Sequence, residues 1–124
     1  MSELEKKNVL SDKSYQFALN IVSLYKKLSI EKEYVLSRQL LKSGTSIGAN
    51  VAEANGAISN SDFSAKISIA YKESLETKYW LRLLKDSDYL EEEKFQSLFE
   101  STDELSKILY SILKSTRIKP KSNN

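Results

Sequence analysis

Apolar side chains recur three and four positions apart along four stretches of the chain, which is the spacing of one buried face on an α-helix. These stretches predict helices over residues 12–29, 32–56, 60–86 and 91–117. Short polar breaks separate the helices, and Ser11 or Asp12 is placed to cap the first one. We expect the residues before the first helix and after the last to form polar tails.

Local signals at the helix ends agree with this division. Gly56 marks the expected end of the second helix, and the spacing from Ser59 to Asp62 is that of a capping box opening the third. The fourth helix is expected to end before Pro120. Helices of roughly 18 to 27 residues joined by short loops pack most simply as an antiparallel, up-down-up-down four-helix bundle. The predicted fold class is therefore all-α, in one domain over residues 1–124.

Composition narrows the chemistry that such a bundle can hold. The 124 residues contain no Cys and no His, which excludes disulfides, zinc–thiolate sites and the Glu-x-x-His pairs of di-iron bundles. Phosphate-loop, nucleophile-elbow and dinucleotide motifs are also missing. We therefore expect no catalytic residues, no cofactor, no metal and no enzyme activity. The first ten residues lack an apolar run, so we expect no membrane anchor and a cytoplasmic location.

Small residues interrupt the apolar stripe of the second helix. Gly44 and Gly48 lie one helical turn apart, beside Ser43, Thr45 and Ser46. Small side chains let two helices approach closely, so this run predicts tight packing within the bundle or between subunits. A kink facing a ligand is the alternative interpretation.

Polar residues on the packed faces of the second and third helices predict a structural network. Because these helices are antiparallel, Arg38 and Lys42 are expected to pair with Glu73 and Glu76 across the interface. Glu73 and Glu76 sharing a proton or holding a cation is the alternative. Lys66 is similarly expected to pair with Glu53, and Asn50 to help fix the helix register. The full predicted network is Arg38, Lys42, Asn50, Glu53, Lys66, Glu73 and Glu76.

Basic residues gather at two places. One group lies on a stripe of the third helix and the other at the carboxyl-terminal end, where no acid follows Glu104. Both suit contacts with a phosphate backbone. The competing interpretation is ordinary surface charge, with Lys78 meeting Glu100, Lys85 facing Glu93 and the basic end complementing the helix dipole. The candidate nucleic-acid contacts are Lys78, Arg82, Lys85, Lys114, Arg117, Lys119 and Lys121.

Three aromatic residues, Tyr79, Trp80 and Tyr110, lie beside the apolar stripes instead of on them. Aromatic side chains in such positions suit a subunit interface or a base-stacking surface. Subunit interfaces are the more common use, so these residues predict an oligomer.

Several segments match the pattern of a known family: Gln39–Ser43, Thr45–Glu53, Asp62–Phe63, Ile69–Ala70 and Ser74–Glu76. They resemble the four-helix-bundle family of bacterial 23S rRNA intervening-sequence proteins, which is also similar to the accessory variability proteins of diversity-generating retroelements. The Ser-Ile-x-x-Asn-x-Ala-Glu core is the most specific part. Ala54 departs from the glycine that members commonly have, and Gly56 is expected to end the helix in its place.

The resemblance implies a non-enzymatic bundle that assembles into a ring, a homopentamer, encoded in some bacteria inside insertions of the large-subunit rRNA gene. The retroelement relatives are thought to bind nucleic acid and a reverse transcriptase. Two functions follow as hypotheses. One is a homo-oligomeric scaffold that binds RNA or DNA without reading sequence. The other is a protein–protein adaptor, for example an accessory subunit of a reverse transcriptase. Neither involves a membrane.

Overall fold

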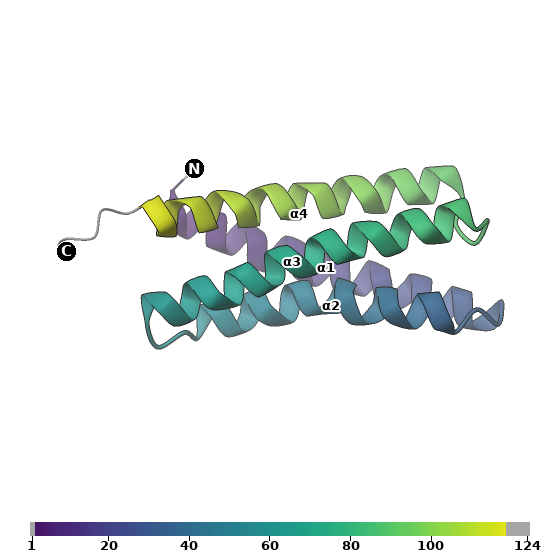
Figure 1. Cartoon of the computed structure of the whole chain (residues 1–124), viewed down its shortest axis with the longest axis horizontal. Helices are drawn as coiled ribbons and strands as arrows, with labels where there is room; N and C mark the ends of the chain where they lie inside the picture. The colour runs from purple at the N-terminus through teal and green to yellow at the C-terminus, as the bar shows by residue number, and fades with distance from the viewer. Residues whose placement is uncertain (1, 119–124) are drawn as a thin grey trace.

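The computed structural model of the protein describes residues 2–118, and these residues form four helices (Figure 1). They are α1 (Glu3–Ile30), α2 (Val35–Asn55), α3 (Asn60–Asp86) and α4 (Glu92–Ile118). Consecutive helices are antiparallel and lie side by side, so the chain runs up and down the bundle in sequence order. The predicted all-α, up-down-up-down four-helix bundle is confirmed, and all secondary structure among the described residues is helical.

The first helix begins nine residues before the predicted start. Ser2 Oγ accepts a hydrogen bond from the Glu5 backbone N–H at 3.1 Å, and Glu5 Oε1 accepts one from the Ser2 N–H at 2.9 Å. This reciprocal capping box starts the helix, and the burial of Leu10 holds its first turns on the bundle. The prediction of a helix starting at residue 12 after a polar tail was therefore wrong. The missed signal was the Ser-x-x-Glu spacing at Ser2.

A buried carboxylate caps the second helix, which begins at Val35 and not at residue 32. The Glu33 carboxylate accepts hydrogen bonds from the backbone N–H groups of Val35, Leu36 and Ser37, at 3.1, 3.1 and 2.7 Å. Burial by itself raises the pKa of Glu33, but these backbone hydrogen bonds outweigh it and leave the pKa below its usual value. Glu33 is thus the group that satisfies the free N–H groups at the start of α2.

Glycine brings α1 and α2 together. A Cβ atom on Gly48 would lie 3.2 Å from the Ser14 backbone oxygen, and one on Gly44 would lie 3.0 Å from the Ile21 side chain. Both distances are shorter than ordinary van der Waals contact, so a side chain at either position would have to displace the α1 atoms that glycine lets approach. The predicted tight packing within the bundle is confirmed.

Hydroxyl groups form a buried polar layer between the other helices. The Thr77 and Ser43 hydroxyls lie 3.1 Å apart and join α3 to α2, whereas those of Ser74 and Ser106 lie 2.7 Å apart and join α3 to α4. All four residues are buried. Each polar group therefore has a partner, which explains why small polar residues occupy core positions of α2 and α3.

Candidate interaction surface on α3 and α4

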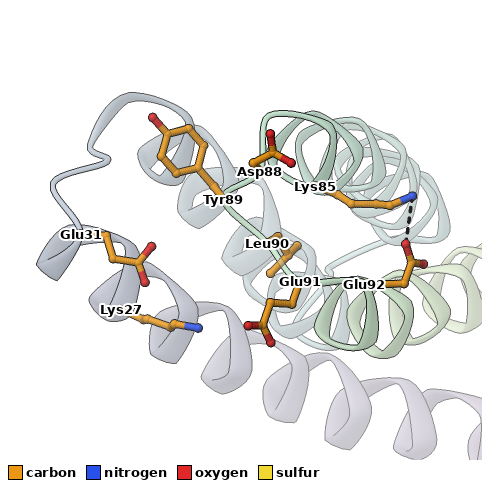
Figure 2. Close-up of a pocket in the computed structure, with 8 residues that line it drawn as sticks. All are labelled: Lys27, Glu31, Lys85, Asp88, Tyr89, Leu90, Glu91 and Glu92. Atoms are coloured by element: carbon orange, nitrogen blue, oxygen red, sulfur yellow. Dashed lines mark ion pairs between the residues drawn. The ribbon is translucent and has the colours of Figure 1, made fainter.

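Two of the predicted nucleic-acid contacts are engaged within the bundle. Lys78 Nζ lies 2.6 Å from Asp103 Oδ1, and Lys85 Nζ lies 3.3 Å from Glu92 Oε1 (Figure 2). The competing interpretation placed Lys78 at Glu100 and Lys85 at Glu93, and both partners were wrong: the acids that pair lie three positions and one position away. Each lysine also lies over an aromatic ring of α4, Phe99 for Lys78 and Phe95 for Lys85. These ammonium groups join α3 to α4, which leaves less of their charge for a phosphate backbone.

The remaining basic candidates do not form one surface in the described residues. Arg82 and Lys114 are exposed and make no ion pair within residues 2–118, but they lie on different helices and far apart in the antiparallel register. Lys119 and Lys121 lie outside the described residues, as does the side chain of Arg117. The third-helix stripe therefore retains one unpaired cation, Arg82.

Part of the predicted structural network is present. Lys66 Nζ lies 2.9 Å from Glu53 Oε1, across the α2–α3 turn. Neither Arg38 nor Lys42 forms an ion pair with Glu73 or Glu76, so that expectation was wrong for these described side chains. Glu76 instead accepts a hydrogen bond from Trp80 Nε1 at 3.1 Å, within α3.

Glu73 is the member of that network whose carboxylate pKa is raised. Partial burial raises it most, the nearby Glu76 carboxylate raises it further, and Lys42 partly offsets both. Lys42 is thus close enough to act electrostatically without making a direct pair. The folded protein therefore favours the protonated form of Glu73 more than the unfolded chain does.

Asn50 does not link two helices. Its Nδ2 donates to the Ser46 backbone oxygen at 2.8 Å, inside α2. The prediction that Asn50 fixes the register between helices was wrong, because the buried hydroxyl pairs carry those interhelical bonds.

Aromatic and aliphatic side chains gather on the outer side of α3 and α4. Leu75, Tyr79 and Tyr110 have exposed fractions of 45%, 57% and 53%, and the ring centroids of Tyr71 and Tyr110 are 5.8 Å apart. We call Tyr71, Leu75, Tyr79 and Tyr110 the aromatic surface. Three of its members, Tyr71, Leu75 and Tyr110, border a cavity of about 300 Å³ that also reaches Lys78 and Asp103. Contiguous exposed apolar side chains of this kind are typical of an interaction site.

The aromatic surface differs in part from the three predicted interface residues. Tyr79 and Tyr110 belong to it, whereas Trp80 is partly buried against the core and packs edge-on to Tyr79. Tyr71 and Leu75 were missed. Their signal was the four-residue spacing from Tyr71 through Leu75 to Tyr79, which places the three side chains on adjacent turns of one helix face.

The opposite side of the bundle has a different character. Tyr15 and Leu19 are exposed on α1, and the small residues Ala49 and Ala52 are exposed on α2. They lie around the α1–α2 crossing at Gly48. The α1–α2 side therefore exposes small side chains beside large ones, whereas all four members of the aromatic surface are large.

A charged cavity of about 470 Å³ lies between the end of α1 and the α3–α4 turn (Figure 2). Lys27 of α1 and Glu31, which follows that helix, extend into it, and Glu91 extends from the α3–α4 turn. Its charges are of both signs. Within the described residues, no group of three or more His, Cys, Asp or Glu side chains is placed to hold a metal ion.

Comparison with known proteins identifies the family. Residues 6–111 match the family of the 23S rRNA-intervening sequence protein. The chain belongs to this family. A crystal structure at 1.70 Å of a protein of unknown function, from the S23 ribosomal protein family of Bacteroides thetaiotaomicron VPI-5482, is similar over 88% of this chain and 98% of that one. The two are 50% identical, with a TM-score of 0.86. Among curated proteins no match is found.

The family match covers some of the candidate residues and not others. The matched segment contains the whole aromatic surface and both engaged lysines, Lys78 and Lys85. Lys114 and the rest of the basic end lie beyond it. Membership in the family therefore bears on the α3–α4 surface and not on the basic terminus. In residues 2–118, none of the helices combines the length and apolarity needed to cross a bilayer.

Proposed function

We propose that this protein is a non-catalytic scaffold that assembles with copies of itself through the aromatic surface. The observation that supports this is the exposure of Leu75, Tyr79 and Tyr110 on one face, where folding alone gives no reason for large apolar side chains. Tyrosine is among the residues that contribute most to protein interfaces, since its ring is large and its hydroxyl stays hydrated or bonded. Such a scaffold acts in the cytoplasm, in keeping with a chain that uses no cysteine.

The unlike character of the two sides supports a ring. A contact between two different surfaces is heterologous, and heterologous contacts close into rings when the rotation between copies permits. In such a contact, large side chains of one copy would pack against small side chains of the next, with Tyr79 and Leu75 facing Ala49 and Ala52. The homopentamer implied by the family resemblance is an assembly of this type.

Light scattering on the purified protein tests the proposal. Leu75→Ser combined with Tyr79→Ser should lower the molecular mass to that of one chain, while circular dichroism shows an unchanged helix content. Tyr89→Ser is the matched control, because Tyr89 is exposed in the α3–α4 turn, away from the aromatic surface. A wild-type protein that is monomeric at high concentration would exclude the proposal, as would an oligomer that the double variant leaves intact.

Nucleic-acid binding is a second candidate, supported by the unpaired cations Arg82 and Lys114. Binding through phosphates should weaken steeply with added salt and should not depend on sequence. Arg82→Gln with Lys114→Gln should reduce both affinity and salt slope. An affinity for nucleic acid that does not change with salt, or that this double variant leaves unchanged, would count against phosphate binding. It would favour the remaining alternative, an adaptor whose aromatic surface binds a partner protein such as a reverse transcriptase.

A further inference from the structure

A cavity of about 790 Å³ lies at the end of the bundle opposite the charged one. The start of α1, the α2–α3 turn and the end of α4 meet at this end (Figure 1). Ligand sites in proteins commonly have volumes in this range. The cavity is lined by residues of all four helices and of the turn, including Leu4, Lys7, Asn8, Asn55, Ile58, Asn60 and Phe63.

Among the described side chains that line the cavity, none is Asp or Glu. Asp62 and Glu53 follow or precede lining residues in the sequence, and both are engaged in other contacts. Asp62 accepts a hydrogen bond from the Ile58 backbone N–H at 3.3 Å, and Glu53 pairs with Lys66. An anion entering the cavity therefore meets no carboxylate among the described lining side chains, where repulsion would be strongest.

Lys7 supplies the positive charge of the cavity. Its ammonium group lies 4.5 Å from the centroid of the Phe63 ring, and it forms no ion pair among the described side chains. Contact with the ring holds the group in place without neutralising it, since an aromatic ring has no net charge. The lysine keeps hydrogen-bond donors free for an oxygen ligand.

Neutral polar and apolar groups complete the site. The carboxamides of Asn8, Asn55 and Asn60 each offer donors and an acceptor, and asparagine matches the hydrogen-bonding edge of adenine through both. Ile58 and Leu4 also line the cavity and are exposed to 94% and 68%, so both leave apolar surface available to a ligand. A flat heterocycle would bury this surface while its edge reaches the carboxamides.

We propose that this end cavity binds a nucleoside 5′-monophosphate unit, with adenine as the preferred base. The phosphate lies at Lys7, the base packs against Ile58 and Leu4, and the asparagine carboxamides bind its edge. The unit has two possible sources, a free nucleotide or a residue of single-stranded RNA. The site is separate from the aromatic surface, so the proposal does not depend on self-assembly.

Calorimetry with the full chain tests the assignment, using AMP, adenosine and inorganic phosphate as separate probes. AMP should bind, and adenosine and phosphate should each bind at least about tenfold more weakly, because each lacks one set of contacts. Lys7→Gln should weaken AMP binding by a similar factor. Lys72→Gln is the matched control, since Lys72 is an exposed lysine of α3 that does not line the cavity.

A second variant separates loss of binding from loss of fold. Asn60→Asp adds a carboxylate to a cavity that has none, but at the first position of α3 an acid is favourable to the helix. It should keep its helix content and lose AMP binding. Failure of AMP to bind the wild-type protein, or equal binding by Lys7→Gln and Asn60→Asp, would overturn the proposal.

Oligoadenylate distinguishes the two sources. Binding of single-stranded oligoadenylate that AMP displaces identifies an RNA residue as the occupant, and binding of AMP without oligoadenylate identifies the free nucleotide. Both results support the site. Oligoadenylate binding that is insensitive to AMP and to Lys7→Gln would place any RNA contact elsewhere and contradict the assignment.

Discussion

The α2–α3 seam and the α1–α4 seam are built in different ways. Between α2 and α3, the buried hydroxyls of Ser43 and Thr77 meet inside an apolar core. Between α1 and α4, which touch least of all neighbouring helices, a groove of about 1080 Å³ remains, and the half-exposed pair of Lys13 and Glu104 lies beside it at 3.1 Å. Buried polar pairs are costly to break, whereas exposed ion pairs contribute little.

This difference implies that α1 is held mainly by α2. Gly44 and Gly48 let α1 approach α2 closely, and no comparable contact joins α1 to α4 in the described residues. The close crossing with α2 and the burial of apolar side chains such as Phe17, Ile21 and Leu28 therefore hold α1 on the bundle, and its contact with α4 adds less.

The largest expected effect comes from filling that crossing. Gly48→Leu should lower the free energy of unfolding by about 3 kcal/mol, because the new side chain meets the Ser14 backbone, which cannot move aside as a side chain can. Urea unfolding followed by circular dichroism measures the loss. The control is Ala65→Leu at an exposed position of α3, which should change little. Equal stability of the two variants would show that the crossing is not tight.

Removal of the α2 cap should have the next largest effect. Glu33→Gln should cost about 2 kcal/mol at neutral pH, since the charged acceptor of three backbone hydrogen bonds is lost. Because the folded pKa of Glu33 is depressed, its contribution is present above its unfolded pKa of about 4.3 and is lost as the pH falls through the folded value. Stability curves of wild type and variant should therefore converge in acid. Parallel curves would contradict the capping role.

A pair of double-mutant cycles compares the two seams directly. Ser43→Ala with Thr77→Val should give a coupling energy of about 1 kcal/mol, because both hydroxyls are buried. Lys13→Gln with Glu104→Gln should give less than about 0.5 kcal/mol, since both side chains are half exposed. Addition of salt should reduce only the second coupling. A larger coupling at the exposed pair would reverse our comparison of the seams.

A single substitution at Glu73 should have a small effect of opposite sign. Its folded pKa is raised, so the protonated form is favoured in the folded protein and a penalty appears as the pH rises through that value. At neutral pH, Glu73→Gln should stabilise the protein slightly, by less than about 1 kcal/mol. The gain should vanish in acid, where Glu73 is protonated. A clear loss of stability at neutral pH would mean that the charged carboxylate has a favourable partner.

The candidate surface shows where prediction from sequence succeeded and failed. Tyr79 and Tyr110 could be placed beside the apolar stripe by periodicity, which is a property of one helix at a time. The ion-pair partners of Lys78 and Lys85 could not be predicted in this way. Asp103 and Glu92 lie on another helix, and other acids lie within a few positions of them. The end cavity draws residues from the start of α1, the α2–α3 turn and α4, which no local pattern connects.

Local interactions determined the four helices and their order in a bundle, because apolar spacing, caps and short turns act within a few residues of one another. Even the missed start of α1 was encoded locally, in the Ser2 and Glu5 capping box. Tertiary structure decided the axial offset of each helix and its distance from its neighbours. This offset places Asp103 next to Lys78 and Lys7 over the Phe63 ring. It also leaves the Glu73 carboxylate without a direct ion-pair partner among the described side chains. Such choices depend on how whole helix faces fit together, and this fit is a property of the packed interior.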